Sequence, residues 1–233
     1  MFLSVLFGSA FGGTDIPKSK RSINAVKKVT PIISRELTKE GLSLGSQVYI
    51  RIFKEEKVLE LWVKSNNFFK LFKSYPICTF SGNLGPKTRT GDYQAPEGFY
   101  FVKASNLNPY SNYHLSFNLG YPNRYEREKG YTGGALMVHG SCVSIGCYAM
   151  TDPIIEEIYT LVEAALSNGQ PYFRVHAFPF RMTNENMEKH SSSKWFKYWE
   201  NLQEGYLKFE EYEHIPPNVE VNNGKYIFNK PES

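Results

Sequence analysis

The chain has 233 residues and a mass of 26.8 kDa, which allows one large domain or one domain with an extension. Its content of 41% hydrophobic and 21% charged residues excludes a disordered chain, and three cysteines exclude a disulfide-rich scaffold. The net charge of +4 comes from scattered lysines and arginines, so we predict no nucleic-acid partner. The aromatic content of 15% favours a β-rich core or a substrate groove.

The N-terminus begins with an apolar segment, residues 1–12, which is shorter than the ~20 residues of a membrane span. It has the length of the hydrophobic region of a secretory signal, and Gly8, Ser9 and Ala10 supply small residues for cleavage, although the usual basic residues are missing. We predict a signal-peptide remnant; the alternative is a short strand or helix. No later stretch has the length of a transmembrane segment, so we expect no transmembrane anchor. Residues 13–45 are predicted to be a spacer with one helix at residues 32–40.

Strands are predicted from residue 47 onward. Apolar residues alternate over 48–52 and 59–63 on either side of a polar turn at 54–57, the pattern of a hairpin. Further strands are predicted at 68–72, 75–80, 115–119 and 135–138. Residues 81–100 are rich in glycine and proline and form a long loop, a class of segment that is more often functional than idle.

The second half of the chain contains helices as well. Asp152 as N-cap, Pro153 at the first helical position and Gly169 at the end predict a helix. A strand at 173–180, a helix at 193–212 and a terminal hairpin around Asn223 and Gly224 follow. The predicted fold class is therefore mainly β with flanking helices (α+β).

The segment MVHGSCVSIGCYAMTD, residues 137–152, gathers the groups that can carry chemistry. Cys147 lies just before a helix N-terminus, which favours an anion and would lower the pKa of a thiol from its usual ~8.5. His139 can fold back toward Cys147 as a base, and Gly146 leaves backbone N–H groups free to bind an oxyanion. These residues predict a cysteine acyl-transfer site.

Other interpretations remain open at this point. His139 and Cys147 can be structural, and Cys142 can form a disulfide with Cys147 that masks the nucleophile. The same three residues can bind zinc, although a fourth ligand at ordinary spacing is absent. Cys78, within an apolar strand, is predicted to be a buried small hydrophobe, and Ser144 to be a loop residue that bonds the backbone.

Several blocks of the sequence together resemble one family. His139 and Gly140, followed by Ser144-Ile145-Gly146-Cys147, resemble the signature of the L,D-transpeptidase catalytic (YkuD) domain, HG, a spacer, then S/T-x-G-C. The loop at 82–100 resembles the glycine-rich loop and strand of that family. The short spacer, the added Cys142 and residues 178–182 look closest to its YafK-like branch in Gram-negative bacteria.

The resemblance implies a β-sandwich or barrel-like catalytic domain at residues 46–177 with a helical C-terminal extension, 178–233, packed on it. It implies Cys147 as nucleophile, His139 as general base and then acid, and oxyanion or backbone support from Gly140, Gly146 and Tyr148. Neither a metal nor a cofactor is expected.

The implied substrates are peptidoglycan stem peptides. Cys147 would form a thioester with the carbonyl of a diaminopimelate-like residue at stem position three. An amine acceptor would complete transpeptidation, whereas water would make the enzyme a carboxypeptidase or an amidase that can release a covalently attached envelope lipoprotein. The implied location is the periplasm, reached through an N-terminal signal.

The sequence also departs from the family. Most members carry Arg or Asn two residues after the nucleophile, where this chain has Ala149, and the usual spacer is longer. Lys87, Arg89 or Arg181 would then bind the substrate carboxylate, with Ser144 as a further substrate-binding candidate. The alternative for each charge is a solvated surface residue. A non-catalytic wall-binding module and a zinc-stabilised structural domain are the competing functions.

Overall fold

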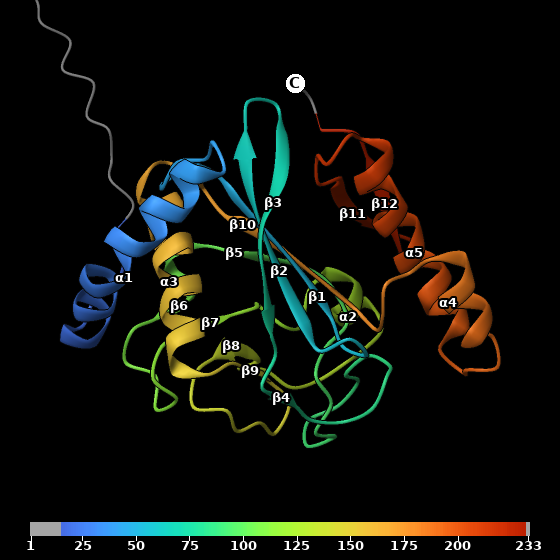
Figure 1. The fold of residues 1–233 in the computed structure, drawn as a ribbon. Helices are drawn as coiled ribbons and strands as arrows, with labels where there is room; N and C mark the ends of the chain where they lie inside the picture. The colour runs from blue at the N-terminus through green and yellow to red at the C-terminus, as the bar shows by residue number, and fades with distance from the viewer. Residues whose placement is uncertain (1–14, 232–233) are drawn as a thin grey trace, which may run out of the picture.

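The structure is a computed structural model that describes residues 15–231 (Figure 1). The signal-peptide remnant expected at residues 1–12 lies outside the described residues. Two five-stranded sheets, a terminal hairpin and flanking helices form the fold, which confirms the predicted α+β class. Of the helices in residues 15–231, none combines the length and the hydropathy that a membrane span requires.

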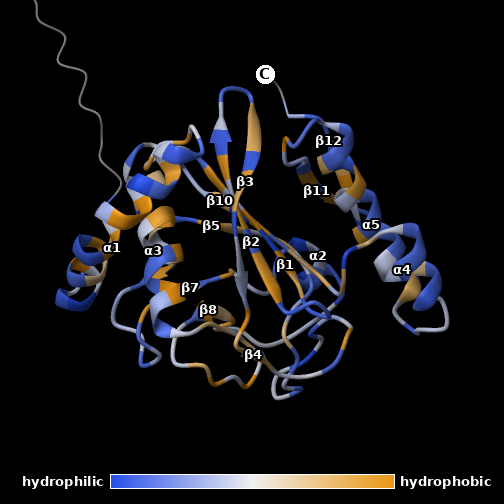
Figure 2. Ribbon diagram, viewed as in Figure 1, coloured by the Kyte–Doolittle hydropathy of each residue, from blue (hydrophilic) through white to orange (hydrophobic). Residues whose placement is uncertain are grey.

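The central sheet has the strand order β3-β2-β1-β10-β5. Its strands, in that order, are β3 (Phe68–Pro76), β2 (Val58–Ser65), β1 (Val48–Phe53), β10 (Phe173–Phe178) and β5 (Gly98–Val102). β1 pairs antiparallel with β2, as the alternating pattern predicts, and parallel with β10, which comes more than a hundred residues later. Figure 2 shows that hydrophobic residues are frequent in the strands at the centre of this sheet.

Both faces of the central sheet are covered, because side chains alternate along each strand. On one face, Ile50 and Leu61 join a core shared with the second sheet and with α3 (Asp152–Ser167). On the opposite face, Phe53 and Phe178 pack against the C-terminal part of the chain. The sheet therefore connects two apolar layers.

The second sheet has the order β4-β9-β8-β7-β6 and consists of very short strands. They are β4 (Thr79–Phe80), β9 (Tyr148–Ala149), β8 (Met137–His139), β7 (Ser116–Asn118) and β6 (Leu107–Asn108), with the 3-10 turn η1 (Ala104–Asn106) before β6 and helix α2 (Arg124–Glu128) after β7. β8 and β9 run parallel, with Val138 opposite Tyr148 and His139 opposite Ala149. This pairing places His139 beside the strand that follows Cys147.

Helix α1 (Lys20–Lys39) packs against α3 and differs from the prediction. It begins at Lys20, after an N-cap at Ser19, whereas the sequence predicted a helix only at residues 32–40. Ala25, Val29 and Leu37 are buried along one side, so the apolar stripe extends through Pro31. For α3 the predicted span is confirmed, but its N-cap is Thr151 and not Asp152.

The C-terminal part covers the face of the central sheet opposite α1 and α3, on the right of Figure 1. It consists of α4 (Asn184–Lys189), α5 (Phe196–Glu211), β11 (Asn218–Asn222) and β12 (Lys225–Asn229). The predicted helix and terminal hairpin are thus confirmed, while the domain boundary after residue 177 stays a prediction.

Candidate active site

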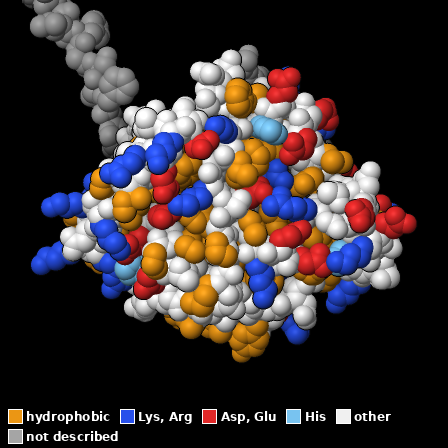
Figure 3. Space-filling view, viewed as in Figure 1, with side chains coloured by type: hydrophobic (Ala, Val, Ile, Leu, Met, Phe, Trp, Pro, Cys, Tyr) orange, Lys and Arg blue, Asp and Glu red, His pale blue; other side chains and the backbone are white. Residues whose placement is uncertain are grey.

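A small cavity of about 220 Å³ opens at the second sheet, next to the turn between β8 and β9. It is lined by Tyr113, His139, Val143, Ser144, Ile145 and Cys147. Its rim is apolar, because Ile145, Val143 and Tyr113 are exposed by 74%, 53% and 41%. Figure 3 shows apolar side chains exposed along the lower edge of the molecule, where the loops of the second sheet lie in Figure 1. The sequence-predicted pair His139 and Cys147 therefore shares one pocket.

The imidazole of His139 is held in one orientation. Its Nδ1 lies 2.6 Å from the carbonyl oxygen of Gly140, and because a carbonyl can only accept, Nδ1 carries the proton. Nε2 is then the unprotonated nitrogen, and it is bonded to nothing among residues 15–231. The ring of Tyr113 lies against the imidazole, with the ring centroids 4.7 Å apart. Burial lowers the pKa of His139 despite the Gly140 carbonyl, so the ring is neutral at neutral pH and can accept a proton at Nε2.

The thiol of Cys147 is half-buried and belongs to the one cysteine that is not in a disulfide. Its Sγ accepts a hydrogen bond from the backbone N–H of Met137 at 3.4 Å and faces the carbonyl of Ala135 at 3.8 Å. Burial raises the pKa of Cys147 above its usual value, and the Met137 N–H and the charge of Lys87 only partly oppose this. The sequence predicted a lowered pKa from the helix dipole; that prediction is wrong, because burial outweighs the favourable charges.

The hydroxyl of Ser144 holds the turn before Cys147. It accepts hydrogen bonds from the backbone N–H groups of Gly146 and Cys147, at 3.2 and 3.0 Å, and donates to the carbonyl of Cys147 at 2.7 Å. Two of the N–H groups expected to bind an oxyanion are thus engaged by this hydroxyl. Tyr148, expected to lend a third, is part of β9 and pairs with Phe80 and Val138.

Gly140 supports His139 through its backbone and its small size. A Cβ at this position would lie 2.6 Å from Oδ1 of Asp152 and 3.0 Å from the side chain of His114. The N–H of Gly140 donates to the carbonyls of Tyr113 and Leu115, while its own carbonyl orients His139. Gly140 therefore brings the Tyr113 segment and the imidazole together.

The comparisons with known proteins agree with this geometry. Residues 47–171 match the family described as "YkuD: L,D-transpeptidase catalytic domain". A protein of Escherichia coli strain K12 named "Putative L,D-transpeptidase YafK" is 51% identical over 190 residues, which cover 82% of this chain and 77% of that protein. The chain belongs to the L,D-transpeptidase catalytic-domain family. The resemblance to this family and to its YafK-like branch is thereby confirmed, and the function of the chain is related to peptidoglycan.

Solved structures of similar shape come from other bacteria. One is the helical cell shape determining protein Pgp2 of Campylobacter jejuni, with a TM-score of 0.46 and 16% identity, covering 81% of this chain and 80% of that one. Another is Bd1075 of Bdellovibrio bacteriovorus, with a TM-score of 0.44 and 18% identity, covering 76% and 78%.

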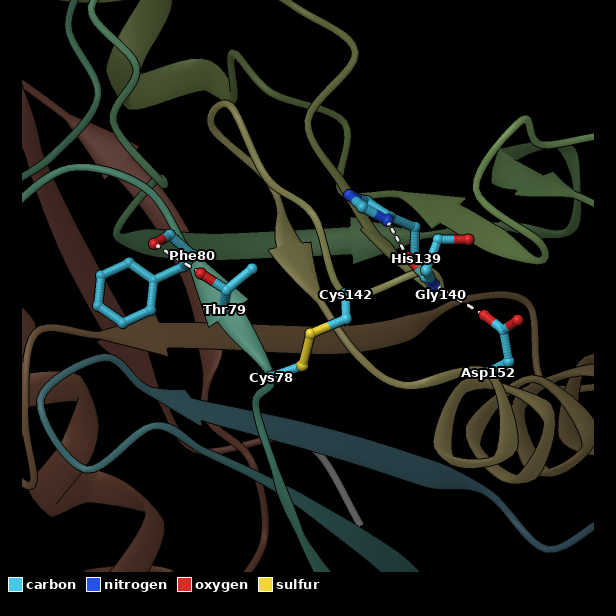
Figure 4. The surroundings of a disulfide bond; sticks show 8 residues. Cys78, Thr79, Phe80, His139, Gly140, Cys142 and Asp152 are labelled. Carbon is cyan, nitrogen blue, oxygen red and sulfur yellow. Dashed lines mark hydrogen bonds between the residues drawn. A yellow bond between two sulfur atoms is a disulfide. The ribbon is translucent and has the colours of Figure 1, made fainter.

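Cys142, the second cysteine of this family member, pairs differently from the prediction. Cys142 forms a disulfide with Cys78, across 64 residues of sequence, so the predicted pairing with Cys147 is wrong (Figure 4). Cys78 is accordingly not a free buried hydrophobe. The bond joins the segment before β4 to the turn between β8 and β9, next to His139, Gly140 and Asp152. Cys142 is also removed as a zinc ligand, and residues 15–231 contain no group of three or more His, Cys, Asp or Glu side chains placed to hold a metal.

The three charged candidates for substrate binding lie in different surroundings. Lys87 is buried, and its Nζ contacts Oδ1 of Asp92 at 2.5 Å and the carbonyl of Arg89 at 2.9 Å. Arg89 is exposed, and its side chain makes no hydrogen bond or ion pair within residues 15–231. Arg181 is paired with Glu60 of the central sheet at 2.7 Å and lies over the ring of Phe53. The charge of Lys87 therefore acts on Cys147 although Lys87 does not line the pocket, Arg89 is unpaired within residues 15–231, and Arg181 lies among residues of β1 and β2 that do not line the pocket.

Three contributors to the site were missed by sequence reasoning. Tyr113 lies in a loop that no motif marks, and only its pairing with Gly140 brings it to His139. The N–H of Met137 is a backbone group, which no residue type reveals. Asp152 was recognised as a capping residue, but its carboxylate accepts the N–H of Ser141 at 2.8 Å and so holds the turn between His139 and Cys147.

Proposed function

We propose that the chain is a cysteine-dependent acyltransferase of peptidoglycan stem peptides that works through a thioester at Cys147. The observation that carries the proposal is the pocket shared by Cys147 and His139, in which Gly140 fixes the proton on Nδ1 and leaves Nε2 free to accept another. A nucleophile and a base at one cavity, with the base oriented by a third group, are the requirements of nucleophilic catalysis.

The first half-reaction starts from a neutral pair. The raised pKa of Cys147 and the lowered pKa of His139 make the thiol and the neutral imidazole the resting forms. As Sγ attacks the carbonyl carbon of the diaminopimelate-like residue, the thiol proton moves to Nε2. The imidazolium then gives this proton to the departing amine, the C–N bond breaks, and a thioester with Cys147 remains.

The second half-reaction consumes the thioester. An acceptor amine attacks its carbonyl carbon and loses a proton to Nε2, and Sγ leaves with that proton as the thiol. Water as the acceptor gives a carboxylate instead, and then the enzyme is a carboxypeptidase or amidase. Both outcomes use the same acyl-enzyme, and they differ only in which acceptor reaches the pocket.

The proposed location is the periplasm of a Gram-negative bacterium. Support comes from the Cys78–Cys142 disulfide, since such bonds persist in oxidising compartments, and from the similarity to a protein of Escherichia coli. The signal-peptide remnant predicted for residues 1–12 is consistent with this location and stays a prediction.

The function is tested with purified protein and sacculi that carry covalently attached lipoprotein. Products are read by mass spectrometry for the wild type, Cys147→Ala, His139→Gln and the control Ser141→Ala, whose exposed hydroxyl makes no hydrogen bond within the described residues. We expect the first two variants to lose turnover and the control to keep it. New 3–3 or 3–4 cross-links identify a transpeptidase, and trimmed stems or freed lipoprotein identify a hydrolase. Full activity in Cys147→Ala would overturn the proposal.

The neutral resting pair has its own test. Because Cys147 is the one thiol outside the disulfide, iodoacetamide labels a single site in the native protein. We expect slow alkylation at pH 7 and a rate that rises with pH through a midpoint above the usual pKa of a free thiol, because burial raises the pKa of Cys147. A midpoint near pH 6 would instead indicate a preformed thiolate–imidazolium pair.

A further inference from the structure

A completely buried ion pair joins the end of β1 to the loop at residues 81–97. Lys54 and Glu97 have no side-chain exposure, and Nζ of Lys54 lies 3.0 Å from Oε1 of Glu97. The same Nζ donates to the backbone carbonyls of Asn83, Gly85 and Ala95, at 2.9 to 3.0 Å. The ammonium group of Lys54 thus binds both ends of the loop at residues 81–97.

Glu97 extends this contact into the C-terminal part of the chain. Its Oε1 also accepts the N–H of Gly85 at 2.7 Å, and its Oε2 accepts the indole N–H of Trp199 in α5 at 2.8 Å. The hydroxyl of Tyr198, also in α5, donates to the backbone carbonyl of Glu97 at 2.6 Å. Helix α5 therefore bonds both the carboxylate and the backbone carbonyl of Glu97.

The loop that this pair fastens also touches the nucleophile's surroundings. The carbonyl of Pro96 accepts a hydrogen bond from the hydroxyl of Tyr148, the residue after Cys147, at 2.6 Å. The carbonyl of Gln94 lies 3.6 Å from where a Cβ of Gly146 would be. The loop also carries Lys87, whose charge acts on Cys147. Displacement of the loop would therefore move both the backbone and the charge beside the thiol.

We propose that Lys54, Glu97 and Trp199 are positioning residues for the reaction at Cys147. Helix α5 then supports catalysis by holding the loop at residues 81–97 in place through Trp199. A buried ion pair is weak evidence for stability, because desolvation cancels most of its attraction. Its value here is geometric, since one ammonium and one carboxylate satisfy five partners from three separate segments. The proposal rests on Cys147 as the reacting group.

The decisive variant is Trp199→Phe, which keeps an aromatic ring and removes the N–H that reaches Glu97. Its matched control is Trp62→Phe, because Trp62 is also buried and donates its indole N–H to a buried carboxylate, Glu60, at 3.0 Å, but without contact to the loop. Both variants lose the same kind of hydrogen bond, so a merely structural role predicts the same outcome for both.

Two readouts are compared at a temperature where circular dichroism shows both variants folded. For Trp199→Phe we expect turnover to fall about tenfold, as a small misplacement of reacting groups does, while alkylation of Cys147 by iodoacetamide becomes faster as the loop loosens. For Trp62→Phe we expect both rates within about twofold of the wild type, the change of a substitution that spares the site. Equal behaviour of the two variants would overturn the proposal.

A second variant covers the ion pair itself. Lys54→Met combined with Glu97→Leu removes both charges without leaving one unpaired, and it is assayed at a temperature where circular dichroism shows it folded. We expect it to reproduce the pattern of Trp199→Phe; wild-type turnover in this variant would overturn the proposal. Alkylation needs no enzymatic turnover, so a wild type without Cys147-dependent activity would contradict the proposed function, while the comparison of alkylation rates would still decide this inference.

Discussion

The turn that carries Cys147 and the loop that contacts it, residues 81–97, are held by different kinds of interaction. The turn at residues 140–147 is fastened covalently, through the Cys78–Cys142 disulfide. The loop at residues 81–97 is fastened by charged groups, through Lys54 and Glu97 at its base and through Lys87 and Asp92 at its tip. One loop therefore depends on the redox state of the surroundings, and the other on protonation.

The disulfide lies in a turn whose backbone conformation is itself unfavourable. Ser141 and Cys142 both have left-handed backbone conformations, with φ of +66° and +50°, which cost free energy in residues other than glycine. The disulfide, the bond from Ser141 N–H to Asp152 and the bond from Cys142 N–H to Met150 hold this conformation in place. The turn between base and nucleophile is thus strained locally and restrained from three sides.

The polar fastening of the other loop is centred on Asp92. Burial alone would raise the pKa of its carboxyl, but the Lys87 ammonium and the N–H groups of Thr88, Arg89 and Gln94 outweigh burial and lower the pKa to about 2. The ionised carboxylate is therefore the form that orders the tip. Reductant should therefore loosen the turn at residues 140–147, and acid should loosen the loop at residues 81–97.

The largest expected effect comes from the covalent side. Removing the disulfide with Cys78→Ser and Cys142→Ser frees a loop of 64 residues in the unfolded chain, which corresponds to roughly 3–4 kcal/mol of unfolding free energy. Urea unfolding of the double variant measures the loss, and reductant should change the wild type by the same amount but leave the variant unchanged. A wild type that is equally stable with and without reductant would show that the bond contributes nothing.

The second effect concerns the charged side and depends on pH. The folded pKa of Asp92, about 2, is below the unfolded value of 3.8, so its stabilisation is complete above pH 3.8 and is lost as pH falls through 2. We expect Asp92→Asn to lower the unfolding free energy by about 1–2 kcal/mol at pH 6 and to match the wild type near pH 2. The disulfide variant serves as the control, because its deficit should not change with pH; a constant deficit in Asp92→Asn would contradict the assignment.

Sequence patterns predicted the parts of this structure that depend on regular spacing. The hairpin of β1 and β2 follows from strict alternation, and α3 from Pro153 at its start and Gly169 at its end. His139 and Cys147 were found through a short motif. They are close in sequence, and the pairing of β8 with β9 keeps them close in space as well.

The parts that sequence patterns missed depend on long-range contacts. Cys78 and Cys142 are 64 residues apart, and the apolar residues around Cys78 indicated a buried hydrophobe and not a disulfide. Lys54 was predicted to be part of a polar turn at residues 54–57, yet it is completely buried, because the loop at 81–97 folds over it. Lys87 was expected to bind substrate; Asp92, which holds it, is only five residues away, but no sequence pattern shows that the loop brings these two side chains together.

A third, smaller effect tests how the turn presents the nucleophile. Ser144→Ala removes the hydroxyl that binds Gly146, and we expect a loss of about 1 kcal/mol in unfolding free energy and a lower turnover. Ser144→Thr keeps a hydroxyl and should restore both, whereas Ser141→Ala should affect neither. A Ser144→Ala enzyme that is faster than the wild type would show that the hydroxyl competes with the substrate oxyanion for the backbone N–H groups.

The smallest effect on stability is expected at the rim of the pocket, which neither the disulfide nor the charged contacts of the loop at 81–97 hold directly. Ile145 is 74% exposed, so Ile145→Ser should change the unfolding free energy by less than about 0.5 kcal/mol. If substrate covers this side chain, the lost apolar contact should raise KM roughly fivefold or more at unchanged kcat, since the contact exists in the ground state and the transition state alike. Ile227→Ser is the control, because Ile227 is 40% exposed on β12 and does not line the pocket. An unchanged KM in Ile145→Ser would show that the substrate does not contact this side chain.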